Sequence, residues 1–194
     1  MQDEGILPNT FTFSCVLKAC GKTEAIDEGH GMHMHITYKG FEKDLFLGKS
    51  IVSMYVKCGA LSDAWGVFMK LPVQDVVSWT SLLVGYTDDG PSEEAFNCFK
   101  EMQLQGILPD AFSFSSILRA CSNAGAIEKG FEIHKEIIHE GFEKDLVVGS
   151  ALVNMYVLCG SFAEAQEVFD ELPQHCVVAW NALIGGFVDY GTAE

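Results

Sequence analysis

The chain repeats itself with a period of 101 residues. The sequence TFTFSCVLKAC, from Thr10, aligns with AFSFSSILRAC, from Ala111, and LGKSIVSMYVKCG, from Leu47, aligns with VGSALVNMYVLCG, from Val148. A fixed long period is typical of proteins in which one supersecondary unit stacks on copies of itself. This repetition restricts the possible folds more than any other feature, and it predicts a repeat array.

Each long period contains three shorter units. They span residues 10–44, 45–75 and 76–110, then 111–145, 146–176 and a cut-off unit 177–194. The five whole units are 35, 31, 35, 35 and 31 residues long. Residues 1–9 end in GILPN, much as the unit 76–110 ends in GILPD, so we interpret them as the tail of a preceding unit. The chain is therefore expected to be a fragment that begins and ends within a unit.

Each unit is expected to contain two helices. In 76–110 the apolar residues from Val76 to Tyr86 follow helical spacing, Asp88-Asp89-Gly90 ends the first helix, and Pro91 begins the second. A small residue early in each second helix should let paired helices approach closely. These small residues are Ala25, Ala64, Ala95, Ala126 and Ala165. The pattern predicts an all-α fold, a right-handed α-solenoid of helix-turn-helix repeats.

Composition excludes several classes of protein. With 48% hydrophobic and 20% charged residues in 194, the chain should fold, unlike a disordered or fibrous sequence. The seven cysteines include no C-x-x-C pair, which predicts reduced, buried thiols. The longest uncharged stretch, 146–163, contains glycine and polar residues, so no membrane span is predicted. The amino terminus has no targeting pattern, so the protein is cytosolic or its true terminus is missing.

Three features together resemble the pentatricopeptide repeat family. They are the unit ending G-[IF]-x-[PK]-[DN], the alternation of 35 and 31 residues, and the phrases VVSWTSLLVGY at 76–86 and MYVKCGALSDA at 54–64. The chain is particularly similar to the plant PLS subclass, in which long, short and standard repeats alternate. Under that resemblance 10–44 and 111–145 are L-type repeats, 45–75 and 146–176 are S-type, 76–110 and 177–194 are P-type, and 1–9 is the tail of a preceding P repeat.

The resemblance implies sequence-specific binding of single-stranded RNA, one base per repeat. In the family, first helices line the concave face. The fifth and last residues of a unit hydrogen-bond the base edge, and the second residue packs on the base. In 76–110 these roles fall on Thr80, Asp110 and Val77. The family code for Thr with Asp favours guanine, whose N1–H and N2–H₂ donors suit a carboxylate acceptor.

The other units carry a mixed set of residues at these places. The L-type units repeat a small hydroxyl with an acid, although L-type units in the family read bases less reliably. The S-type units depart from the usual amide-bearing pairs. The pairs are Ser14 with Asp44, Ser115 with Asp145, Lys49 with Asp75 and Ser150 with Cys176, and Asn181 is a favourable fifth residue in the last unit. The base-packing residues are Phe11, Phe46, Val77, Phe112, Val147 and Val178, for which plain core packing is the alternative.

The formal net charge of −15 argues against a uniformly basic nucleic-acid surface. The charge is unevenly distributed, however. The expected first helices hold five basic and three acidic residues, and the rest of the chain holds seven basic and 24 acidic residues. The five basic residues are Lys18, Lys22, Lys49, Lys57 and Arg119, and all of them except Lys49 are expected to interact with the RNA backbone. A mildly positive groove inside an acidic shell permits RNA binding with weak non-specific affinity and a shallow salt dependence.

Neither a catalytic site nor a metal site is predicted. The histidines of His30-x-x-His33-x-His35 do not share one helix face, and only His33 recurs, as His134, so a structural role is favoured over metal binding. The zinc deaminase signature, H-x-E followed by C-x-x-C, does not occur. We therefore expect no enzymatic activity, no cofactor and no small-molecule substrate. Any editing chemistry would belong to a later part of the protein or to a partner.

The expected function is recognition of single-stranded RNA in a mitochondrion or chloroplast, positioning C-to-U RNA editing or processing with protein partners. One alternative is a tetratricopeptide-like scaffold that binds a peptide or partner protein, which the acidic charge would suit if the ligand were basic. Another is a spacer whose neighbouring repeats read the RNA. Lys49 and Cys176 at reading places favour the spacer.

Overall fold

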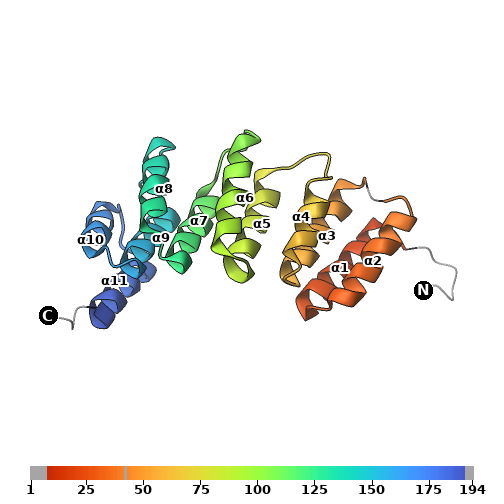
Figure 1. Cartoon of the computed structure of the whole chain (residues 1–194), viewed down its shortest axis with the longest axis horizontal. Helices are drawn as coiled ribbons and strands as arrows, with labels where there is room; N and C mark the ends of the chain where they lie inside the picture. Colours follow the sequence, from red (N-terminus) through yellow and green to blue (C-terminus); the bar gives the residue numbers. More distant parts are fainter. Residues whose placement is uncertain (1–7, 42, 191–194) are drawn as a thin grey trace. The chain divides into compact units, whose positions relative to one another are not determined.

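The computed structural model describes residues 8–41 and 43–190, and every regular element within these ranges is an α-helix. Parts of the predicted end units, 1–9 and 177–194, lie outside them. The helices are α1 Thr10–Thr23, α2 Ile26–Tyr38, α3 Leu45–Lys57, α4 Leu61–Phe68, α5 Val76–Asp89, α6 Ser92–Leu104, α7 Ala111–Ala124, α8 Ile127–His139, α9 Leu146–Leu158, α10 Phe162–Glu171 and α11 Val177–Tyr190 (Figure 1). The prediction of an all-α array of helical hairpins is confirmed. No helix in the described ranges combines the length and apolarity needed to cross a bilayer.

The helices fall into two compact units, Met1–Gly90 and Pro91–Glu194. In the first unit α1 packs along α3 and α3 along α5, so first helices of successive repeats are neighbours, and α2 and α4 pack against them. The second unit repeats this arrangement, with α7, α9 and α11 as neighbours and α6, α8 and α10 packed against them. In each unit the core therefore lies between a layer of first helices and a layer of second helices.

An aromatic contact joins α4 to α5 in the first unit and α10 to α11 in the second. The rings of Phe68 and Trp79 meet edge to face with centroids 4.6 Å apart, and Phe169 and Trp180 do so at 4.8 Å one period later. Phe68, Trp79 and Phe169 are buried, whereas Trp180 is 48% exposed. Burying a large apolar side chain contributes about 1.5–3 kcal/mol, and edge-to-face geometry is a favoured arrangement of aromatic rings. The contact therefore holds one repeat to the next.

A histidine–tyrosine hydrogen bond likewise recurs one period apart. Nδ1 of His33 lies 2.9 Å from the Tyr55 hydroxyl, and Nδ1 of His134 lies 2.8 Å from the Tyr156 hydroxyl. Burial lowers the pKa of both histidines and raises the pKa of both tyrosines to about 12. These histidines thus tie a second helix to the next first helix. In the same cluster, His30 lies 3.5 Å from Asp63 and the ring of His35 packs on Phe13 at 5.8 Å.

The small residue of the second helices is placed differently from the prediction in two repeats. Ala64, Ala95 and Ala165 are buried at the fourth residue of their helices, as expected. Ala25 and Ala126 instead precede their helices as N-cap residues. The fourth residue there is Gly29 or Gly130, where a Cβ would lie 2.5 or 2.6 Å from a methionine sulfur. The prediction was wrong by one helical turn because alanine and glycine both satisfy close approach.

All seven cysteines are free thiols, and the prediction that they are buried is only partly right. Cys20, Cys98 and Cys121 are buried, but Cys15 lies exposed on α1, and the others are half-buried. Burial raises the pKa of Cys98 and Cys121 to about 12. These two thiols are therefore packing groups rather than nucleophiles.

Replacing Gly85 should destabilise the first unit, because the α5 backbone approaches its neighbours closely there. A Cβ at Gly85 would lie 2.6 Å from Cγ1 of Val56 and 3.0 Å from Cδ2 of Leu61. We expect Gly85→Ala to lower the free energy of unfolding by about 1–3 kcal/mol through overpacking. Thermal unfolding followed by far-UV circular dichroism measures the change.

The matched control is Gly66→Ala on α4, where an added Cβ meets no atom within 4 Å. This substitution should raise the stability by about 0.5–1 kcal/mol through helix propensity alone. Equal shifts in the melting temperature for the two variants would contradict the close-approach explanation.

Candidate nucleic-acid interface

The second residue of each first helix presents an apolar side chain to solvent. The exposed fractions of these side chains range from 47% to 69%. Nearby residues on the same helices are buried, for example Phe13 at 3% and Leu47 at 0%. The exposed set is Phe11, Phe46 and Val77 in the first unit, and Phe112, Val147 and Val178 in the second. Regularly spaced exposed apolar groups offer surfaces on which planar ligands such as bases can stack.

The last residue of a repeat caps the first helix of the next repeat. Oδ1 of Asp75 accepts from the Ser78 backbone N–H at 3.0 Å, and Oδ1 of Asp110 accepts from that of Ser113 at 2.8 Å. Asp44 and Asp145 cap α3 and α9 in the same way. Sequence reasoning missed this capping role, although an Asp directly before an apolar helical run is a recognised N-terminus signal.

In the units 45–75 and 146–176 the fifth and last residues contact each other. Nζ of Lys49 lies 2.5 Å from Oδ2 of Asp75, and Oγ of Ser150 lies 3.0 Å from Sγ of Cys176. The hydrogen bond from Lys49 is the largest cause that lowers the pKa of Asp75 to about 2. The hydrogen bond from Ser150 lowers the pKa of Cys176. The fold thus brings together these two pairs of sequence-predicted residues.

The remaining predicted residues lie in less uniform surroundings. Ser14 is only 1% exposed, and its hydroxyl lies 3.1 Å from that of Ser50. Ser115, one period later, is half-buried on α7. Thr80 is half-buried on α5 in the first unit, whereas Asp110 caps α7 in the second. The side chain of Asn181 is exposed on α11.

Acidic residues are segregated between the two kinds of helix. Every second helix has an acid in its first turn, as in Glu93 and Glu94 of α6. No first helix among the described residues has one. The amino-terminal end of a helix carries a partial positive charge, which an acid in the first turn would offset. Four first helices instead carry their acid at the N-cap, as Asp44, Asp75, Asp110 and Asp145. The two kinds of helix therefore differ in where the acid lies, and in both a carboxylate offsets the charge at the amino-terminal end.

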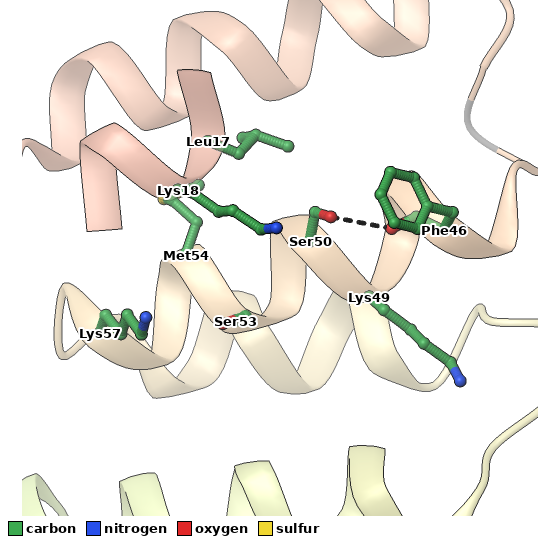
Figure 2. Close-up of a pocket in the computed structure, with 8 residues that line it drawn as sticks. All are labelled: Leu17, Lys18, Phe46, Lys49, Ser50, Ser53, Met54 and Lys57. Carbon is green, nitrogen blue, oxygen red and sulfur yellow. Dashed lines mark hydrogen bonds between the residues drawn. The ribbon is translucent and has the colours of Figure 1, made fainter. Parts of the chain in front are cut away.

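A groove of about 260 Å³ between α1 and α3 concentrates positive charge. Its lining residues are Leu17, Lys18, Phe46, Lys49, Ser50, Ser53, Met54 and Lys57, none of which is acidic. Figure 2 shows the Lys18 side chain extending towards Ser50, whereas the Lys49 side chain points away from it. Ammonium groups beside an exposed ring match a nucleotide, which combines a phosphate with a planar base. The sequence did not identify Ser50 or Ser53 as groove residues.

The other two predicted cations also lie on first helices. Lys22 is exposed in the last turn of α1, and Arg119 is exposed on α7. Arg119 occupies the place of Lys18 one period later, but Leu158 stands in place of Lys57. Four of the five predicted first-helix cations therefore belong to the first unit.

Comparisons with known proteins identify related sequences over the whole chain. The model of the PPR repeat family matches residues 74–123, and that of the PPR repeat matches 112–142 and 150–177. A pentatricopeptide repeat-containing protein of Arabidopsis thaliana is 36% identical over 194 residues, covering 100% of this chain and 20% of the relative. Chloroplastic and mitochondrial relatives from the same plant are each 37% identical, covering 98% and 96% of this chain. The chain spans 31% and 18% of their respective lengths.

Solved structures match the same fold. The maize pentatricopeptide repeat protein PPR10 superposes with a TM-score of 0.76 at 23% identity, covering 99% of this chain and 29% of that protein. PPR10 in complex with an 18-nucleotide psaJ RNA element also gives 0.76, at 19% identity, covering 97% of this chain and 29% of that protein. These similarities support the helical-repeat fold described above.

Removing the Lys49 ammonium should raise the pKa of Asp75 above about 2. The depressed pKa means that the ion pair stabilises the folded state above the ordinary value of 3.8 and is lost as the pH falls through about 2. A carboxyl-carbon NMR titration of wild type and Lys49→Gln measures the shift. Hydrogen bonds from Ser78 remain in the variant, so the pKa should return only part of the way. An unchanged midpoint would contradict the ion pair.

Proposed function

The chain belongs to the PPR repeat family, and from this membership we propose that it binds single-stranded RNA along its first helices, one base per repeat. The observation that carries the proposal is the exposed apolar side chain at the second residue of six successive first helices. A base can stack on each such surface irrespective of its identity. The maize PPR10 structure that contains RNA supports the same ligand class.

The electrostatics of the first helices support this ligand despite the net charge of −15. Aspartates cap four of these helices, but the α1–α3 groove presents lysines without a carboxylate among its lining residues. Because contacts between phosphates and basic groups depend on local charge and release counterions, an acidic outer layer does not prevent them. We expect a modest salt dependence, consistent with few cations.

The proposed reading pair of the repeat 76–110 is Thr80 with Asp110. The cap of α7 uses Oδ1 of Asp110, and within the described second unit only Ser113 hydrogen-bonds this carboxylate. Oδ2 is the oxygen that we propose accepts from a guanine edge. Ser115 with Asp145 offers a similar hydroxyl and cap. Ser14 is a weaker candidate because its hydroxyl is buried against Ser50.

The narrower proposal places the chain in the plant PLS subclass, where it would position RNA editing or processing in a mitochondrion or chloroplast. The alternation of 35 and 31 residues supports the subclass. The chloroplastic and mitochondrial relatives support an organelle. In this proposal the chain recognises RNA, and the chemical step belongs to another part of the protein or to a partner.

Exchanging Thr80 for asparagine should change the preferred base. Selection and sequencing of a randomised single-stranded RNA pool should enrich guanine at one position with the wild type. With Thr80→Asn the family code predicts a shift to uracil at that position. A motif that ignores residue 80 would overturn the reading pair but leave RNA binding intact. Absence of enrichment at low salt would overturn RNA binding and favour a protein scaffold or a spacer, tested by partner pull-down.

Removing the exposed aromatic ring of Phe112, the second residue of α7, should weaken RNA binding irrespective of which base stacks on it. Loss of stacking on one aromatic side chain costs about 1–3 kcal/mol, so Phe112→Ala should weaken binding to a selected RNA by that amount. Leu104→Ala is the matched control, because Leu104 is 70% exposed on a second helix, α6. Fluorescence anisotropy with labelled RNA compares the two. Equal losses would place the binding surface elsewhere.

A further inference from the structure

We propose that the repeat 45–75 holds a nucleotide without selecting its base. The reason is that Lys49 forms an ion pair with the carboxylate of Asp75, which would otherwise contact the base edge. This inference rests on the RNA binding proposed above. It concerns base specificity within the site, and it assigns Lys49 the role of blocking recognition at one repeat.

The Asp75 carboxylate is engaged at both of its oxygens. Oδ1 accepts from the backbone N–H of Ser78 at 3.0 Å and from its hydroxyl at 2.6 Å, and Oδ2 lies 2.5 Å from Nζ of Lys49. Asp110 makes the same two bonds through Oδ1, to the N–H and hydroxyl of Ser113, each at 2.8 Å. The two caps are alike, and the added lysine distinguishes Asp75. A base edge would have to displace this ammonium to reach Oδ2.

Lys49 is also a poor reader while it is paired. A free ammonium could donate to the acceptor atoms of guanine. The Lys49 side chain points away from Ser50 (Figure 2), and its ammonium is paired with Oδ2 of Asp75. If the Lys49 ammonium turned to a base, Oδ2 of Asp75 would lose its ion pair. The free energy needed to break this ion pair opposes any base preference of Lys49. Neither member of the pair is then free to discriminate.

The groove keeps the parts that bind a nucleotide irrespective of its base. The Phe46 ring is 52% exposed, and Lys18 and Lys57 line the groove beside it. Stacking on a ring and contacts to phosphate carry no direct sequence information. One period later, the residues in place of Phe46, Lys49 and Lys57 are Val147, Ser150 and Leu158. The arrangement therefore belongs to the repeat 45–75 and not to its counterpart.

The test is to release Asp75 by replacing Lys49. Lys49→Thr gives this repeat the same residue types as Thr80 and Asp110, and Lys49→Ser gives those of Ser115 and Asp145. Selection from a random RNA pool is run with the wild type and both variants, after circular dichroism confirms that each is folded. The variants should gain a guanine preference at one nucleotide next to that governed by Thr80. RNAs differing only there should bind the variants with about fivefold preference for guanine over adenine, and the wild type nearly equally.

Lys57→Gln is the matched control, because it removes a groove lysine that is not paired with Asp75. This variant should weaken binding to the same extent for RNAs that carry any of the four bases at this nucleotide, and it should add no base preference. A wild-type preference at this nucleotide that is lost in Lys49→Thr would overturn the inference and make Lys49 a reader. Folded variants that bind RNA without a new preference would also overturn it. Failure of every protein to enrich RNA would instead overturn the proposed function.

Discussion

The packing of each first helix against the first helix of the next repeat is the interaction on which the rest of the structure depends. In the first unit α3 contacts the first helices α1 and α5 and the second helices α2 and α4, and the part of its surface that carries Phe46 remains exposed. Its buried residues, such as Leu47 and Ile51, face these neighbours. The groove lysines lie with Phe46 along the α1–α3 groove. The repeated apolar pattern thus forms the core and also determines which residues stay exposed and can contact a ligand.

The sequence predicts the helices well because their signals are local. The glycine-containing ends and the apolar spacing each act within one or two turns of the chain, and the 101-residue period shows the same signals a second time. The surroundings of the reading residues are less predictable because they depend on neighbouring helices. Ser14 and Ser115 occupy equivalent places, but Ser14 bonds to Ser50, whereas the residue in place of Ser50 one period later is Ala151. The Lys49–Asp75 contact likewise joins residues 26 positions apart, beyond the reach of local patterns.

The distribution of charge matters more for this chain than its total. Acids gather in the first turns of second helices, where they favour the helix dipole, and they are absent from those of the described first helices. Screening in physiological salt limits the reach of exposed charges to about 8 Å. A ligand in the α1–α3 groove therefore experiences mainly the nearby lysines. A net charge of −15 and an anionic ligand are compatible on this account.

The helix caps limit how such an array can evolve. Asp75 and Asp110 begin a helix and also stand at the proposed reading place. Asn, Asp, Ser, Thr and Gly are the residues that cap well, and replacing a good cap by alanine costs about 0.5–2 kcal/mol. A mutation that adapts a repeat to a new transcript must therefore also preserve helix initiation. Few residue types are therefore allowed at the last position of a repeat, because that residue must also start a helix. A change in the target sequence would be matched more easily by substitution of the fifth residue, which caps no helix.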